Sequence, residues 1–333
     1  MSRTYTFVIP VYNRPQEIRE LLMSFLELEG VFDFEILIIE DGSTLTSKSV
    51  VEAFITRLKI SYHFKPNSGP GDSRNYGMSI SKADYFIILD SDVILPPHYL
   101  LAVDDALNTH HFDCYGGPDQ SHKDFSTTQK AIDFSMTSFL TTGGIRGNKH
   151  SQTSSYEPRS FNMGISRKAF IASGGFGKIH PGEDPDLSIR LKNLGFNLGF
   201  IPEAYVYHKR RIDLNKFYSQ VSKFGRVRPI LMKWHPECYK ITFLFPSLFC
   251  LGLLISFMLI PLSLSLLVLY GIYFLLVFLS SLFKYRSFNV ALLTIFAVLV
   301  QFFGYGIAFA KSYFKILILK QNPQKVYPNL FFK

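Results

Sequence analysis

Tyr85-Phe86-Ile87-Ile88-Leu89-Asp90-Ser91-Asp92 is an apolar run that ends in two aspartates one residue apart. The apolar part is typical of a buried β-strand. In an extended backbone, side chains two positions apart point to the same side, so Asp90 and Asp92 can face one ligand. Carboxylate oxygens suit a hard cation such as Mg²⁺ or Mn²⁺. The pattern predicts a divalent-cation and diphosphate site at a strand end, although a solvated turn after a strand would use the same residues.

Strands and helices alternate on the amino-terminal side of this run. Strands are predicted near residues 5–9, 34–39 and 60–64, and helices near residues 16–28, 46–58 and from residue 73 onward. This alternation predicts a Rossmann-like α/β fold with a doubly wound, mostly parallel sheet. Such sheets bind ligands at the carboxyl ends of their strands, where Pro10, Asp41 and Asp90 all lie. The site should therefore be assembled from several strand ends.

A third group of acids is Glu183-Asp184-Pro185-Asp186, which precedes apolar residues at helical spacing over 187–191. Proline is favoured at a first helical position, so the pattern predicts a helix that starts near Pro185 with Asp184 at its cap. The glycine-rich loop 172–177 before it should be flexible and able to bring this helix start over the strand ends.

Five segments occur in one order along the chain: Val8-Ile9-Pro10-Val11-Tyr12-Asn13, Ile38-Ile39-Glu40-Asp41-Gly42-Ser43, Gly69-Pro70-Gly71-Asp72-Ser73-Arg74-Asn75, Asp90-Ser91-Asp92, and Gly182-Glu183-Asp184-Pro185-Asp186-Leu187. Each is weak alone, but the set is specific in its order and spacing. Over residues 5–235, the chain resembles the family 2 nucleotide-sugar glycosyltransferases, which have the A-type glycosyltransferase fold.

The resemblance implies roles on the donor side. Pro10, Tyr12 and Asn13 would line the nucleotide pocket, and Asp41 would accept a hydrogen bond from the base or ribose. A uracil N3–H is a donor that a strand-end carboxylate can accept. Arg74, after a glycine-rich loop, would meet phosphate or base oxygens. The local sequence alone equally allows Asp41 to cap a turn and Arg74 to be a surface residue.

The resemblance also implies a metal centre, because a sugar diphosphate leaves readily only when its developing charge is neutralised. Asp92 would hold Mn²⁺ or Mg²⁺, with Asp90 on the ribose or supporting the metal, and Ser91 beside them in the donor site. His208 would be a further ligand. Its alternative is a histidine satisfied at a strand end, because imidazole is a less usual partner for a hard cation.

For the acceptor side, the resemblance makes Asp184 the general base. Glu183 and Asp186 would orient it or touch the acceptor. The alternative for Asp184 is the helix cap described above.

The composition of the carboxyl-terminal part of the chain predicts that this part attaches to a membrane. The net charge is +9, and residues 241–333 hold no Asp or Glu but six Lys and one Arg. No charged residue occurs over 241–283 or over 287–310. A span needs about 20 apolar residues, so the first run allows two crossings that turn near Pro261 and the second allows one more. A third full span would export Lys311, Lys315 and Lys320 against the positive-inside tendency, so the alternative is a last segment that is re-entrant or interfacial. The basic residues flank apolar runs, which favours a lipid surface and excludes nucleic acid as a partner.

We therefore expect a catalytic domain over residues 1–235 and a membrane-anchoring helical region with a basic tail over 236–333. Residues 1–4 are too short for a leader and Arg14 interrupts the next apolar stretch, so we expect the catalytic domain to face the cytosol at the inner membrane. Apolar residues at helical spacing over 214–229 predict a helix that lies on a membrane surface or packs on the catalytic domain. Residues 112–160 could form an acceptor-binding lid.

The expected function is an inverting, metal-dependent transfer of a hexosyl or N-acetylhexosaminyl group. The donor would be a nucleotide-diphosphate sugar, UDP favoured, and the acceptor a lipid-linked or cell-surface saccharide of the cell envelope. One alternative is a processive polysaccharide synthase, but such enzymes carry Gln-x-x-Arg-Trp where this chain has Gln220 through Phe224. A sugar nucleotidyltransferase would show a glycine-rich loop after the first strand, and no glycine precedes Gly30. A non-catalytic membrane scaffold would not need three acidic clusters.

Overall fold

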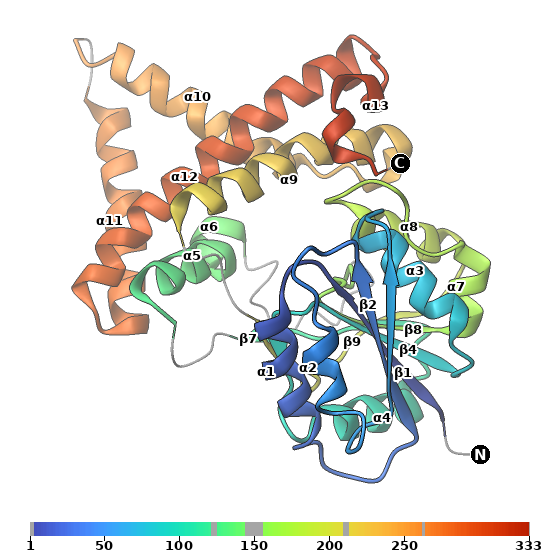
Figure 1. The fold of residues 1–333 in the computed structure, drawn as a ribbon. Coiled ribbons are helices and arrows are strands. Elements are labelled where there is room, and N and C mark those ends of the chain that lie inside the picture. Colours follow the sequence, from blue (N-terminus) through green and yellow to red (C-terminus); the bar gives the residue numbers. More distant parts are fainter. Residues whose placement is uncertain (1–2, 121–124, 144–155, 209–212, 262–263, 333) are drawn as a thin grey trace. The chain divides into compact units, whose positions relative to one another are not determined.

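The computed structural model describes residues 3–120, 125–143, 156–208, 213–261 and 264–332 (Figure 1). The chain divides into two compact units. The first, which we call the sheet unit, comprises Met1–Gln120, Lys149–Lys209 and Phe331–Lys333. The second, the helical unit, comprises Ser121–Asn148 and Arg210–Leu330. This division differs from a boundary at residue 235, because two earlier segments pack with the carboxyl-terminal helices.

The sheet unit is built on a seven-stranded sheet, in the order β3 (Ile60–Lys65), β2 (Phe34–Asp41), β1 (Tyr5–Val11), β4 (Tyr85–Leu89), β8 (Asn162–Ser166), β6 (Cys114–Gly116) and β9 (Leu198–Phe200). β1 pairs in parallel with β2 and β4, and β2 with β3, while β8 is antiparallel to β4 and β6. The predicted mostly parallel sheet is thus confirmed. The carboxyl ends of β1 and β2 lie side by side, since Val11 pairs with Glu40.

Helices cover both faces of this sheet (Figure 1): α1 (Pro15–Phe25), α2 (Lys48–Glu52), α3 (Pro70–Ile80), α4 (Tyr99–His110), α7 (Arg167–Ser173) and α8 (Glu183–Asn193). Neighbouring β1 residues point to opposite faces: Phe7 packs with Leu22 of α1, whereas Val8 packs with Met78 of α3. Two separate apolar cores result, as in a doubly wound sheet. The helix predicted over 46–58 is shorter, because only Lys48–Glu52 is helical.

A second, three-stranded sheet consists of β5 (Val93–Ile94), β10 (Val206–His208) and β7 (Asp119–Gln120). β5 follows the aspartates at the end of β4, and β10 pairs antiparallel with it. This small sheet joins the strand end of β4 to a segment more than a hundred residues later in the chain.

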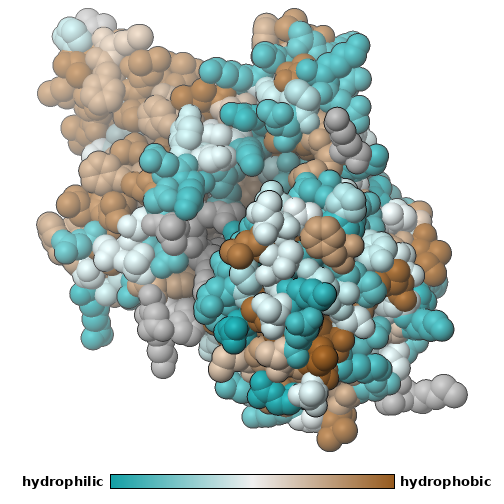
Figure 2. Space-filling model, in the orientation of Figure 1, coloured by the Kyte–Doolittle hydropathy of each residue, from teal (hydrophilic) through white to brown (hydrophobic). Residues whose placement is uncertain are grey.

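The helical unit contains α5 (Thr127–Thr137), α6 (Phe139–Thr142), α9 (Leu214–Trp234), α10 (Phe245–Met258), α11 (Ser265–Tyr285), α12 (Phe288–Tyr313) and the short α13 (Pro323–Val326). Within the described residues, three helices are long and apolar enough to cross a membrane: Ile241–Met258, Ser265–Tyr285 and Phe288–Ile318. The break between the first two comes after residue 258, near Pro261 as predicted. Hydrophobic side chains gather on the surface of α10 and α11 (Figure 2).

α9 and α12 pack closely within the helical unit. A Cβ added to Gly225 of α9 would lie 2.4 Å from the carbonyl oxygen of Tyr305, so the two backbones approach where a side chain would not fit. Phe217 and Val221 of α9 are buried in a cluster with Ala297 of α12. The apolar face of α9 therefore packs on α12 and also on α5, a segment of the predicted catalytic domain.

Candidate functional site

The aspartates at the end of β4 are each paired with a different arginine. Ser91 and Asp92 form a turn, so the extended geometry assumed for the two acids ends at Leu89. Nη1 of Arg14 lies 2.8 Å from Oδ2 of Asp92, whose side chain is 11% exposed. Nη2 of Arg74 lies 2.8 Å from Oδ1 of Asp90, which is 34% exposed. Both carboxylates therefore sit beside positive charge.

Arg74 is buried, so the alternative that it is a surface residue is wrong. Its side chain is 3% exposed, and its guanidinium lies over the Phe176 ring at 5.3 Å. Besides Asp90, it donates from Nη1 to Oε1 of Glu183 at 3.1 Å. Among the described residues its Nε has no hydrogen-bond partner. One guanidinium thus bridges the end of β4 and the start of α8.

The acids of α8 occupy its first turn. The helix begins at Glu183, and Gly182 is the residue at the cap, with φ +121° that favours glycine. Asp184 is therefore not the cap, and that alternative is wrong. Glu183 is buried, and its Oε1 lies 2.8 Å from Nδ1 of His180. Asp184 is half-buried, and its Oδ1 is buried with no hydrogen-bond partner in the described structure.

The environments of Glu183 and Asp184 drive their pKa values apart. Burial alone would raise both, but His180 and Arg74 together hold the pKa of Glu183 below its usual range. Burial and the neighbouring charge of Glu183 raise the pKa of Asp184 to about 6, while Arg74 and Arg159 oppose the rise. Adjacent carboxyls with separated pKa values are typical of acid–base sites.

Asp186 pairs with Arg190, which in turn holds the loop before α8. Oδ2 of Asp186 accepts from Nε and Nη2 of Arg190 at 3.0 and 2.8 Å. Arg190 also donates to the carbonyl oxygens of Ser173 and Gly175 at 2.6 and 2.7 Å. On the other side, Nδ2 of Asn75 donates to the carbonyl of Phe176 at 2.9 Å. The loop predicted to be flexible is thus fastened from two helices.

Asp41 lies at the end of β2, where its carboxylate organises the next loop. Its Oδ1 accepts from Nζ of Lys65 at 2.8 Å and from the Ser68 amide at 2.9 Å, and its Oδ2 accepts from the Gly69 amide at 2.9 Å. The carboxylate is 4% exposed. These contacts place the glycine-rich turn that opens α3, which carries Arg74.

The first strand end carries three of the predicted donor-side residues. Pro10 lies beyond the pairing with β4, which ends at Val8, so its missing amide proton costs no hydrogen bond on that side. Tyr12 is 53% exposed. Asn13 has φ +55°, a conformation that asparagine tolerates, and its Oδ1 accepts from the Thr44 and Leu45 amides at 2.9 and 2.8 Å. Asn13 therefore shapes the loop after β2.

His208 is placed near the aspartates by backbone pairing: it lies opposite Val93, the residue after Asp92, in the β5–β10 pair. Among the described residues, no group of three or more His, Cys, Asp or Glu side chains lies together. The part of the predicted lid over residues 121–124 and 144–155 lies outside the described residues.

Sequence reasoning missed several residues of this site. Phe332, near the carboxyl terminus, donates its amide to the carbonyl of Lys178 at 3.0 Å. Its ring lies against Gly69, where an added Cβ would come within 2.3 Å of it. His180 and Arg14 were missed too. Phe332 and Arg14 have partners far away in the sequence, whereas the partner of His180 is Glu183, only three residues on.

Comparison with known proteins gives the family. The model of "Glycosyl transferase family 2" matches residues 6–173, which include the ends of β1, β2 and β4. The chain belongs to glycosyl transferase family 2. Among curated family relatives, validoxylamine A glucosyltransferase of Streptomyces hygroscopicus subsp. jinggangensis is 33% identical over 99 residues, 29% of this chain and 24% of that protein. The succinoglycan biosynthesis protein ExoW of Rhizobium meliloti is 31% identical over 114 residues, 33% of this chain and 36% of that protein.

Solved structures extend the likeness in fold beyond the region of the family 2 match. Mannosyltransferase PcManGT of Pyrobaculum calidifontis, solved with GDP-Man and Mn²⁺, has a TM-score of 0.55 at 14% identity and covers 99% of this chain and 84% of that one. TarS 1–349 of S. aureus, solved with UDP, has a TM-score of 0.51 at 16% identity and covers 96% of this chain and 92% of that one. The A-type glycosyltransferase fold is thereby confirmed.

Proposed function

We propose that the chain is a membrane-attached, inverting glycosyltransferase that uses a nucleoside-diphosphate sugar, UDP favoured, as donor and a hydroxyl of a lipid-linked or cell-surface saccharide as acceptor. The observation that carries the proposal is the Glu183–Asp184 pair. One carboxyl is held ionised by His180 and Arg74, and its neighbour has a raised pKa and an Oδ1 that is buried with no hydrogen-bond partner among the described residues. A base with a pKa near the working pH is the most effective proton acceptor.

The transfer is a single displacement. The acceptor oxygen attacks the anomeric carbon of the donor sugar while its proton passes to the carboxylate of Asp184. The bond from the anomeric carbon to the diphosphate oxygen breaks, and the nucleoside diphosphate leaves with that electron pair. One displacement inverts the anomeric configuration. Glu183 and Asp186 act as positioning residues, because Arg74 and Arg190 already engage them.

We assign the donor side to the strand ends. The exposed Tyr12 ring offers a stacking surface for a base, and Asp41 with Asn13 shapes the two loops around it. Pro10 and Ser91 complete this rim. Arg74 and Arg14 place positive charge beside Asp90 and Asp92, where a diphosphate would need it.

A divalent cation fits this donor set. Mg²⁺ and Mn²⁺ commonly bind one or two carboxylates together with substrate phosphates, so Asp92, supported by Asp90, suffices without a three-residue cluster. His208 is a further candidate ligand because its backbone lies beside the strand that follows Asp92. When bound, the cation would neutralise charge that develops on the leaving diphosphate. The mannosyltransferase PcManGT, which has a similar fold, was solved with Mn²⁺, and this supports a divalent cation here.

The membrane part favours an acceptor at a lipid surface. Three candidate spans would attach the chain, and Lys284 in the last turn of α11 with Arg286 directly after the helix favours a cytosolic position for that end by the positive-inside tendency. Relatives named for succinoglycan biosynthesis and for poly(ribitol-phosphate) glycosylation support a cell-envelope saccharide as acceptor.

A donor panel tests the proposal. The purified full chain is incubated with UDP- and GDP-sugars, membrane lipid extract and Mn²⁺, and release of nucleoside diphosphate is followed together with label in the lipid phase. We expect both signals for at least one donor and neither for Asp184→Asn. Release of pyrophosphate from a nucleoside triphosphate and a sugar phosphate would instead identify a nucleotidyltransferase. Absence of turnover with every donor would argue for a scaffold.

A further inference from the structure

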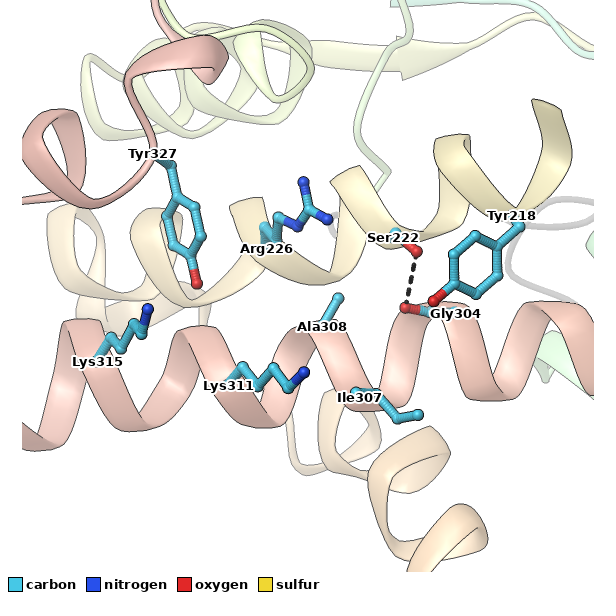
Figure 3. Close-up of a pocket in the computed structure, with 9 residues that line it drawn as sticks. All are labelled: Tyr218, Ser222, Arg226, Gly304, Ile307, Ala308, Lys311, Lys315 and Tyr327. Atoms are coloured by element: carbon cyan, nitrogen blue, oxygen red, sulfur yellow. Dashed lines mark hydrogen bonds between the residues drawn. The ribbon is translucent and has the colours of Figure 1, made fainter. Parts of the chain in front are cut away.

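A cavity of about 250 Å³ lies inside the helical unit between α9 and α12 (Figure 3). It is lined by Tyr218, Ser222, Arg226, Gly304, Ile307, Ala308, Lys311, Lys315 and Tyr327. None of these residues belongs to the sheet unit, so the cavity is separate from the strand-end site.

Beside the cavity, α9 and α12 approach closely at Gly304 and are joined there by a hydrogen bond. A Cβ on Gly304 would come within 2.7 Å of Val221 and 3.1 Å of the Tyr218 ring, so only glycine fits there. The Ser222 hydroxyl donates to the Gly304 carbonyl at 3.2 Å, as drawn in Figure 3. The Ser222 hydroxyl and the Gly304 carbonyl are thus paired with each other, and neither carries a charge that could neutralise the cations of the cavity.

Three cations line the cavity, and no acid of the helical unit within the described residues forms an ion pair with any of them. Arg226 comes from α9, and Lys311 and Lys315 come from the end of α12 and the turn after it. Residues 214–234 and 241–333 contain no Asp or Glu. The acids of the helical unit within the described ranges are engaged elsewhere: Asp133 pairs with Lys284, Asp213 with Lys216, and Glu237 with His235. Like charges that line one cavity repel one another, and a bound anion would relieve that repulsion.

The cavity also opens beside lipid-compatible surface. Ile307 lines it and is 42% exposed, while Phe314 and Ile318 further along are 55% and 57% exposed. All three belong to the candidate span Phe288–Ile318. A volume of about 250 Å³ is below the roughly 300–1,000 Å³ of pockets that enclose a whole small molecule. It suits a headgroup whose apolar chain stays outside, along the helix.

We propose that this cavity binds the phosphate headgroup of a membrane lipid, with Arg226, Lys311 and Lys315 as its cationic ligands and the Tyr218 and Tyr327 hydroxyls as neutral donors. Guanidinium and ammonium groups both bind phosphate oxygens through charge-assisted hydrogen bonds. Basic pockets between membrane helices are a known mode of headgroup recognition. The proposal does not depend on the transfer reaction, because no residue of the strand-end site takes part.

Binding to the full chain in phosphatidylcholine nanodiscs tests this, with a fluorescent phosphatidic acid as the probe. The variant Arg226→Gln/Lys311→Gln/Lys315→Gln should weaken binding about 100-fold. The matched control Lys223→Gln/Lys320→Gln/Lys325→Gln removes as many charges from exposed positions outside the cavity, and should change binding by less than about twofold. Equal losses in both variants would show a non-specific surface-charge effect and overturn the proposal.

Two further measurements test whether the lipid occupies the cavity and whether the ligand is a lipid headgroup or free phosphate. Ile307→Trp keeps every charge but fills the cavity from an exposed position, so it should also weaken binding; unchanged binding would place the lipid elsewhere. Inorganic phosphate should displace the probe only at much higher concentration than unlabelled phosphatidic acid. If both compete equally, the cavity is a site for free phosphate and the lipid assignment is wrong. Thermal unfolding of each variant confirms that it is folded, and none of these readouts requires turnover.

Discussion

Nη1 of Arg74 lies 3.1 Å from Oε1 of Glu183, and both side chains are almost completely buried. The same guanidinium reaches Asp90 at the end of β4. Arg74 therefore links the acids on the donor side to the acids of α8 through one rigid group. This link also explains why two adjacent carboxyls titrate differently, since Arg74 and His180 favour the charge of Glu183 while the charge of Glu183 disfavours that of Asp184.

Replacement of Asp184 tests the proposed base. Asp184→Asn keeps the size of the side chain but cannot accept a proton, so kcat should fall about 10²–10⁴-fold with the donor KM little changed. In the wild type, kcat should fall as the pH drops through about 6, because the carboxylate becomes protonated. The residual activity of the variant should lack this acidic limb. If the variant still showed this fall of kcat at low pH, another residue would be the base.

The raised pKa of Asp184 also predicts a stability difference with a definite sign. The folded pKa of about 6 exceeds the ordinary value of 3.8, so the folded state binds the proton more tightly than the unfolded state. This group therefore favours folding at low pH and disfavours it as the pH rises from about 4 to 6. Asp184→Asn should be more stable than the wild type at pH 8 by on the order of 1–3 kcal/mol, with the difference vanishing near pH 4. Denaturant unfolding at several pH values measures it.

Asp186 serves as the contrasting variant, because its carboxylate is engaged by Arg190. Asp186→Asn should lower the free energy of unfolding by about 1–3 kcal/mol, since a buried charge-assisted pair is weakened and Arg190 loses its hold on the Ser173–Gly175 loop. The pH limb assigned to Asp184 should persist in this variant. If Asp186→Asn were as stable as the wild type and its kcat no longer fell at low pH, Asp186 would be the base and Asp184 the positioning residue.

Replacement of Asp92 tests the cation. Asp92→Asn removes a charge at the proposed metal position, so transfer should be almost abolished and excess Mn²⁺ should restore little of it. Stability should change by less than about 1 kcal/mol, because the partner Arg14 is 36% exposed. Activity in the presence of a chelator is the companion measurement. Full turnover there would contradict a metal-dependent reaction.

Membrane attachment is tested by extraction of the full chain. If the three candidate spans cross the bilayer, the protein should stay in the membrane fraction through high salt and alkaline carbonate, and only detergent should release it. Attachment through the basic side chains alone would be lost in high salt. Release by salt would therefore show that α10, α11 and α12 do not span the membrane.

The sequence alone was sufficient for the strands β1 to β4 of the sheet, their strand-end acids and the apolar helices. Strand and helix periods are local properties of the chain, and a parallel sheet brings successive strand ends to one edge. Uncharged runs such as 241–283 likewise predict spans by length alone. Hence the positions of Asp41, Asp90 and the break near Pro261 followed from the order of residues.

The tertiary structure decided which side chains meet and which charges they carry. The pairs Arg74–Glu183 and Arg14–Asp92 join residues far apart in sequence, and the cap at Gly182 in place of Asp184 follows from where α8 starts in space. The same holds for the cationic cavity, because α9 and α12 lie far apart in the sequence and are brought together by packing that includes Gly225 and Gly304. A pKa depends on burial and on neighbouring charge, and both are properties of the folded chain rather than of its local sequence.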